Sequence, residues 1–197
     1  MALPKEYVAY LANEMAERLA KSGKVTMHDL PAVAAKIQQA ILDDFAQDER
    51  LNQEVRDCLE KYSAQIRRDA ISYQEMYKLV KKELMKKYKI VSAGRPDPDG
   101  AKLSRDKVIA LSHRITKDLA AMKPQIELGV EKNEVRLEIV RQFQALLKEE
   151  FQMDQGVRKK IQSQRREIAE GSAEWEDRKS TRLNSSHIQK SRMPSSA

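Results

Sequence analysis

Apolar residues recur every three or four positions along most of the chain, a spacing that restricts it to amphipathic α-helices. In the N-terminal stretch this spacing is carried by Leu3, Val8, Leu11, Met15 and Leu19, with charged residues between them. The same spacing predicts further helices around 33–45, 51–66, 76–88, 103–119, 135–147 and 153–168. Charged residues make up 34% of the chain and aromatic residues 5%, a balance typical of helical proteins. The sequence therefore predicts an all-α fold.

One short segment interrupts the helical pattern. The stretch "SAGRPDPDG" (Ser92–Gly100) gathers Gly, Pro and Asp at a density that neither a helix nor a strand accommodates. We interpret residues 92–102 as a linker between a first helical unit, residues 1–91, and a second helical unit, residues 103–176.

The second unit repeats the apolar frame of the first. A shift of 100 residues places Val8 on Val108, and a shift of 102 residues places Val55 on Val157. Any two amphipathic helices align by coincidence at a few positions, whereas three consecutive helix pairs in the same order favour a tandem duplication. We therefore predict two related helical units in which these valines occupy equivalent core positions.

Three motifs in the second half resemble a known family. They are "LSRDKVIALSHRITKDL" (Leu103–Leu119), "EVRLEIVRQF" (Glu134–Phe143) and "VRKKIQSQRREIAEGSAEW" (Val157–Trp175). On these motifs the chain resembles a bacterial family catalogued as domain of unknown function 507, with two tandem copies of which the second is truncated. The resemblance implies a helical fold and no assigned activity.

The last residues, 177–197, have no apolar period. Their segment "DRKSTRLNSSH" (Asp177–His187) is what one reading frame of a widely used sequencing-library adapter encodes, and "SRMPSSA" matches the adapter beyond its index. We interpret residues 177–197 as a non-native tail and predict that they are disordered or make no specific packing, because no apolar stripe offsets the ordering entropy. The tail carries five Lys/Arg residues and one Asp, so it supplies more than half of the net charge of +7.

Sequence motifs for common catalytic and metal chemistry are absent. There is no G-x-x-x-x-G-K, G-x-G-x-x-G or H-E-x-x-H motif, and the single Cys58 permits neither an intrachain disulfide nor a CxxC site. We expect His28 and His113 to be structural or surface residues, and the adjacent Asp43 and Asp44 to splay around a helix. The sequence thus predicts no catalytic, cofactor-binding or metal-binding residues and a protein that is not an enzyme.

Two basic clusters remain as candidate contacts for a polyanion or a protein partner. They consist of Lys78, Lys82, Lys86 and Lys89 in the first half, and Arg158, Lys159, Arg165 and Arg166 in the second. A basic helix face can follow phosphates or lie on anionic lipid, and it can equally be a solvated surface with acids nearby. Two functions stay open: an interaction or scaffold protein with a protein partner, and a nucleic-acid-associated protein.

The sequence also bears on location. No apolar run approaches the roughly 20 residues that cross a bilayer, so we expect no transmembrane segment. The first residues lack the basic start and uninterrupted apolar run of a signal peptide. We therefore expect a cytoplasmic protein.

Overall fold

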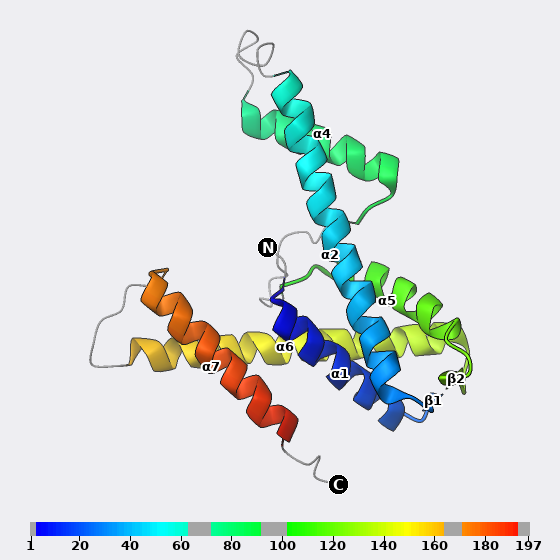
Figure 1. Cartoon of the computed structure of the whole chain (residues 1–197). Helices are drawn as coiled ribbons and strands as arrows, with labels where there is room; N and C mark the ends of the chain where they lie inside the picture. Colours follow the sequence, from blue (N-terminus) through cyan, green and yellow to red (C-terminus); the bar gives the residue numbers. More distant parts are fainter. Residues whose placement is uncertain (1–2, 63–71, 92–101, 164–170, 193–197) are drawn as a thin grey trace.

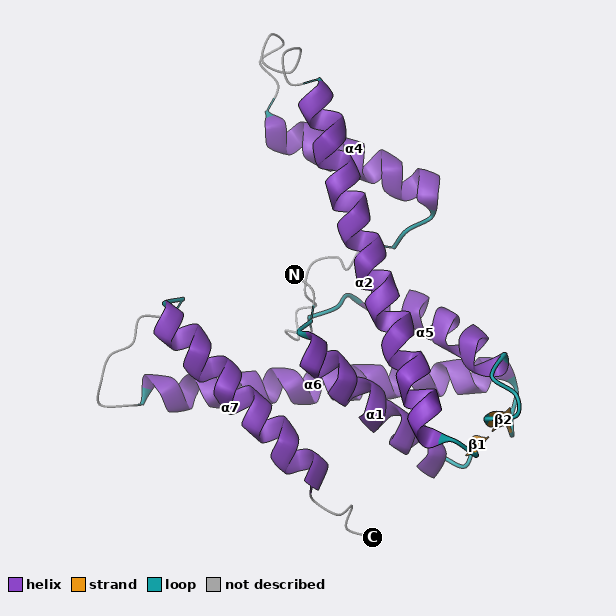
Figure 2. Ribbon diagram, in the orientation of Figure 1, coloured by secondary structure: helices purple, strands orange, loops and turns teal. Residues whose placement is uncertain are grey.

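The computed structural model describes residues 3–62, 72–91, 102–163 and 171–192, most of which are helical (Figure 1 and Figure 2). The elements in chain order are α1 (Lys5–Lys21), β1 (Val25–Met27), α2 (Leu30–Lys61), α4 (Tyr73–Tyr88), α5 (Arg105–Ala120), β2 (Ile126–Leu128), α6 (Lys132–Gln162) and α7 (Ala173–Arg192). In the described part of the chain β1 and β2 are the only strands, and the helical periodicity did not predict them. The fold is mostly helical, so the all-α prediction is confirmed except for this two-stranded sheet.

The helices α2 and α6 are longer than the sequence analysis predicted. Each is one continuous helix where two shorter helices were expected, at 33–45 and 51–66 and again at 135–147 and 153–168. No glycine or proline lies between Phe45 and Leu51, and α6 accommodates Gly156, so nothing ends either helix at these points. Residues 63–66 and 164–168 lie outside the described residues.

Local signals determine where α1 ends and where α2 begins. Gly23, just after α1, has a φ of 69°, a left-handed conformation that glycine adopts without a steric penalty. The Asp29 carboxylate accepts a hydrogen bond from the Ala32 backbone N–H at 2.9 Å, and Pro31 lies in the first turn of α2. Because α1 ends before Gly23 and α2 begins after Asp29, the residues between them are free to form β1.

Both halves of the chain contribute to one main apolar core. Its fully buried side chains include Leu11 and Ile41 from the first half, and Leu111 and Phe143 from the second. Helix α1 packs against α2 and α6, and α5 packs against α6 and α2. The strands β1 and β2 pair antiparallel, with Thr26 opposite Glu127 at the centre. Each half therefore contacts the long helix of the other.

The same order of elements occurs twice in the chain. A helix, a short strand, a long helix and a further helix follow one another as α1, β1, α2, α4 and again as α5, β2, α6, α7. Val8, Val108, Val55 and Val157 are all buried, with exposed fractions between 0% and 5%. The burial that the repeat alignment required is present, while the duplication itself stays a prediction.

Two helical arms extend from this core (Figure 1). We call the first arm Leu51–Lys61 of α2 together with α4, where Val55 and Leu59 form a small cluster with partly buried side chains of α4. We call the second arm residues 153–162 of α6 together with α7, where Val157, Ile161 and Trp175 form another. Each arm is therefore held by a few apolar side chains of its own.

The predicted disorder of residues 177–197 is wrong for residues 177–192. Helix α7 continues through this stretch to Arg192, and residues 193–197 lie outside the described residues. The stretch contains neither glycine nor proline, and Leu183 packs against the cluster of Val157, Ile161 and Trp175. The prediction of disorder failed because no residue in this stretch prevents helix formation and Leu183 supplies one apolar contact that holds the helix.

The predicted linker, residues 92–102, falls almost entirely outside the described residues, which include only Lys102 of it. Among the helices that the structure describes, none has the length and apolar character needed to cross a membrane.

Candidate functional site

The four lysines predicted in the first half all lie on the solvent-exposed side of α4. We call Lys78, Lys82, Lys86 and Lys89 the lysine row. Lys86 pairs with Glu83 at 2.9 Å, and its hydrogen bond keeps the pKa of the Glu83 carboxyl below its usual range. Within the described residues, no ion pair neutralises Lys78, Lys82 or Lys89. The structure therefore places the predicted cluster together as one exposed row.

The opposite side of α4 explains this orientation. Met76, Tyr77, Val80 and Leu84 pack against Val55 and Leu59 of α2. At the seam, Asn52 accepts hydrogen bonds from the Tyr77 hydroxyl at 3.1 Å and from Lys81 Nζ at 2.7 Å. The Tyr88 hydroxyl donates to the Glu54 carboxylate at 2.6 Å. Because this side faces α2, the lysine row points to solvent.

Most of the exposed large hydrophobic side chains of the described residues lie on or next to the first arm. In the described part of the chain, five of the six exposed large hydrophobic residues lie there: Tyr62, Tyr73, Leu79, Tyr88 and Val91. Leu79 is the most exposed of them, at 58%. The sixth, Leu137, is 51% exposed and lies on α6. Sequence reasoning assigned Tyr88 to the apolar face and did not single out Leu79.

The second predicted basic cluster is not brought together in the same way. Arg158 donates to the buried Asp154 at 2.6 Å, and Lys179 pairs with the same carboxylate at 3.0 Å. Burial alone would raise the pKa of Asp154, but these two hydrogen-bonded cations outweigh it and lower the pKa. Lys159 is exposed, and Arg165 and Arg166 lie outside the described residues. Arg158 therefore serves an internal contact of the second arm.

A buried lysine that the sequence analysis did not single out joins the two halves near the base of the first arm. Lys107 of α5 is 1% exposed, and its Nζ lies 2.6 Å from Asp44 and 3.0 Å from Asp48 of α2. It also donates to the Val91 carbonyl, after α4, at 2.8 Å. Burial raises the pKa of the Asp44 carboxyl despite the adjacent lysine. Asp43 points elsewhere, to Arg114 at 2.9 Å, so the two acids splay as predicted.

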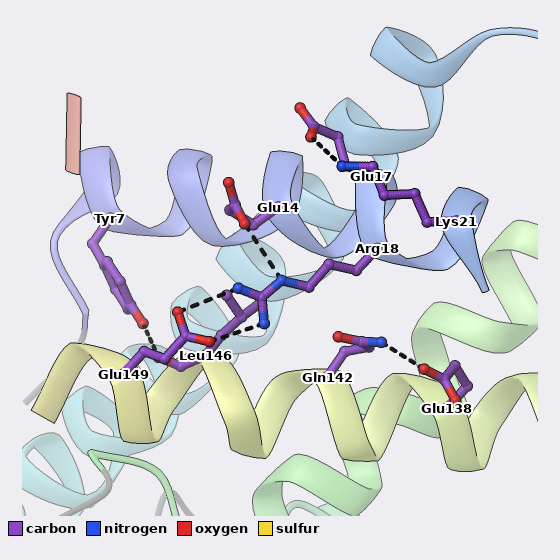
Figure 3. A network of polar contacts seen from close by, with 9 residues as sticks. All are labelled: Tyr7, Glu14, Glu17, Arg18, Lys21, Glu138, Gln142, Leu146 and Glu149. Atoms are coloured by element: carbon purple, nitrogen blue, oxygen red, sulfur yellow. Dashed lines mark hydrogen bonds and ion pairs between the residues drawn. The ribbon is translucent and has the colours of Figure 1, made fainter. Parts of the chain in front are cut away.

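Figure 3 shows a second set of polar contacts, between α1 and α6. The Tyr7 hydroxyl donates to the Leu146 carbonyl at 3.2 Å, and Arg18 donates to both carboxylate oxygens of Glu149 at 3.0 and 3.2 Å. Glu14 pairs with the same Arg18 at 3.4 Å. The contacts of Tyr7 and Arg18 with α6 join the first half of the chain to the second.

An open hollow of about 420 Å³ lies beside these contacts, and its lining consists of Ser22, Lys24, Leu137, Glu138 and Arg141. Glu138 is 4% exposed and accepts hydrogen bonds from Arg141 at 2.6 Å, Gln142 at 2.5 Å and Lys24 at 3.3 Å. Burial alone would raise the pKa of the Glu138 carboxyl. The hydrogen bonds from these three donors outweigh burial, so the pKa lies below its usual value. Lys24 and Arg141, the two cations that line the hollow, are thus both paired with Glu138 of the same lining.

The two histidines and the cysteine that the sequence analysis singled out lie at or near the surface. His28 and His113 are exposed, and Cys58 is a partly exposed free thiol on α2. Among the residues that the structure describes, no group of three or more His, Cys, Asp or Glu side chains is placed to hold a metal ion. The lysine row and the exposed apolar residues near it are therefore the principal candidate site.

Comparison with known proteins identifies the family. A family model described as a protein of unknown function (DUF507) matches residues 1–179 in one stretch that includes both halves. Comparison with curated proteins gives no significant match. Because the family model covers most of the sequence, the chain belongs to the DUF507 family.

Proposed function

We propose that this protein is a non-enzymatic interaction or scaffold protein whose first arm binds a protein partner. The observation that supports this most is that five of the six exposed large hydrophobic residues of the described chain lie on or next to that arm. Exposed apolar groups rimmed by polar residues are typical of sites that bind other molecules. Leu79 is the most exposed of these residues, and Lys78 and Lys82 lie close to it on the same helix.

Copurification from the native host with variants of the full chain tests this proposal. The Leu79→Glu variant should weaken binding of the recovered partner by about tenfold or more, as loss of an apolar interface anchor does. Leu137→Glu is the matched control, because Leu137 has a similar exposed fraction, 51% against 58%, but lies on α6. The dissociation constant of the purified partner is the measurement. Equal loss with both variants, or loss with Leu137→Glu alone, would contradict the proposed role of the first arm.

The second candidate function is association with nucleic acid. The lysine row favours it, because exposed lysines without internal partners attract phosphates. In this case binding should fall steeply with salt, whereas binding to an apolar protein partner should depend on salt much less.

Location and origin complete the proposed description. The single cysteine forms no intrachain disulfide and is compatible with a reducing compartment, so we place the protein in the cytoplasm of a bacterium. The repeated order of elements supports a tandem duplication, with 92–102 as the linker. It also supports treating 1–91 and 103–176 as related units that share a core.

We also propose that residues 177–197 are translated adapter sequence. The family match ends at Lys179, close to the first adapter-like residue, Asp177. Amplification of the gene from the source DNA should reveal a different continuation after Glu176, an aromatic and charged helical segment. Replacing residues 177–197 with it should raise the melting temperature by several degrees, since about 1 kcal/mol corresponds to roughly 2–4 °C in a chain of this size. A gene that encodes the present tail, or that stops within a few codons of Glu176, would overturn this proposal.

A further inference from the structure

We propose that the lysine row of α4 binds the phosphate backbone of duplex nucleic acid without reading its sequence. This inference rests on the second candidate function above, association with nucleic acid, and assigns it a surface and a ligand class. Its first support is the shape of the row. From Lys78 to Lys89 the lysines span eleven helical steps, about 16 Å at the α-helical rise. Three of the four lack an ion pair within the described residues, and of these Lys82 also interacts electrostatically with the Glu83 carboxylate.

The second support is the backbone at Lys89. This residue ends α4 in the left-handed conformation, with φ 54° and ψ 38°. Glycine is the usual residue at such a position, because an L side chain there is sterically strained. The helix C-terminus itself accounts for this conformation, because the Lys89 N–H donates to the Lys86 carbonyl at 3.3 Å and the Ile90 N–H donates to the Met85 carbonyl at 3.0 Å. Within the described residues the Lys89 side chain makes no hydrogen bond or ion pair, so the motif leaves its ammonium group exposed at the end of the row.

Duplex nucleic acid fits this surface better than a membrane does. A helix that lies in a membrane surface buries an apolar face in the lipid. The apolar face of α4 is instead packed against Val55 and Leu59 of α2, and Leu79, on another side of the helix, is 58% exposed. The row therefore offers charge with a single exposed leucine beside it, and not a continuous apolar face that could insert into lipid.

Duplex also fits better than single strands. Proteins that bind single strands stack bases on aromatic side chains placed along the basic groove. The aromatic residues of α4 are engaged elsewhere: the Tyr77 hydroxyl donates to Asn52, the Tyr88 hydroxyl donates to Glu54, and the Tyr73 ring lies 6.5 Å from the Tyr77 ring. A row of lysines contacts phosphates and not bases. A duplex presents its phosphates on the outside while its bases stay stacked, so such a row can bind it without aromatic side chains.

Fluorescence anisotropy of a labelled DNA duplex with the full chain tests the proposal, over salt concentrations from about 50 to 200 mM. The Lys78→Gln/Lys82→Gln variant should weaken binding about tenfold at the lowest salt and reduce the slope of log K against log salt by about 1.8, or about 0.9 for each phosphate contact. The matched control, Lys159→Gln/Lys160→Gln, removes two exposed lysines of the second arm and should change the affinity less than about twofold.

Lys89 provides a test that separates binding from folding. Lys89→Gly relieves the left-handed strain, so hydrogen exchange of the α4 amides should become slower. The same variant should bind the duplex about threefold more weakly, with a slope reduced by about 0.9. Lys89→Arg should keep the wild-type slope. Weaker exchange protection together with weaker binding would overturn the assigned role, since lost binding would then follow from lost structure.

The outcomes of the salt titration are distinct. No binding by the wild-type chain at about 50 mM salt would overturn both this inference and the nucleic-acid function. Salt-dependent binding that survives Lys78→Gln/Lys82→Gln but is lost in the second-arm control would leave that function standing and overturn the assignment to α4. Tighter binding to a single strand of equal length, or binding only to phosphatidylserine vesicles, would overturn the duplex assignment. The scaffold function is tested separately, by copurification.

Discussion

Replacement of Lys107 by methionine is expected to lower the free energy of unfolding by about 3–5 kcal/mol, the range for removing one member of a buried ion pair. Methionine keeps much of the side-chain volume but leaves Asp44 and Asp48 without their cation and the Val91 carbonyl without its donor. Urea denaturation followed by circular dichroism measures the loss.

Two comparison variants make this result specific to the buried pair. Lys21→Met removes a lysine that is 58% exposed and pairs with Glu17 at 3.7 Å, so the loss should stay below about 1 kcal/mol. Adding Asp44→Asn and Asp48→Asn to Lys107→Met should recover part of the lost stability, because no unpaired buried charge remains. A loss below about 1 kcal/mol for Lys107→Met itself would show that these ion pairs are not structural.

Phe143→Ala is expected to cost about 3–5 kcal/mol, the range for truncating a fully buried aromatic side chain. Phe143 is 0% exposed in the core that both halves share, so helices from both halves should unfold together at lower denaturant. Trp175 is the only tryptophan of the chain and is buried in the second arm, so its fluorescence reports that arm. Circular dichroism and tryptophan fluorescence should therefore shift to the same new midpoint.

Leu59→Ala is the matched comparison for Phe143→Ala. Leu59 is also buried, at 1%, but it belongs to the small cluster of the first arm. This variant should speed hydrogen exchange in α4 and leave the Trp175 transition nearly unchanged, because few contacts link the arm cluster to the core. Two separate unfolding transitions in the Phe143→Ala variant, one for each half, would show that the halves do not depend on a shared core.

Apolar spacing was enough to predict much of the helical content and several of the buried positions. It placed Val8, Leu11 and Leu19 on the buried side of α1, and Val108, Leu111 and Ile115 on that of α5. It could not say that α2 and α6 continue, because a change of apolar face along a helix resembles a break between two helices. Strands of three residues, such as Val25–Met27, are too short for an alternating pattern to be recognised.

In the candidate site, too, some residues could be predicted from the sequence and others could not. The lysine row follows directly from helical spacing, since a side chain that avoids the apolar face of α4 faces solvent. Lys107 could not be found from spacing alone, because its acids lie about 60 residues earlier on another helix. A signal was present nonetheless: the shift of 100 residues places Lys107 on Tyr7, and Tyr7 is buried too. A lysine at a repeated apolar position predicts a buried partner of opposite charge.

The antiparallel pairing of β1 with β2 has a consequence for assembly. Val25 lies opposite Leu128 and Met27 opposite Ile126, so the two strands pair symmetrically about Thr26 and Glu127. This is the isologous contact that two identical subunits make about a two-fold axis. A subunit dimer of this kind dissociates on dilution, because its stability depends on protein concentration. With both partners in one polypeptide, the contact is intramolecular and holds at any cellular abundance.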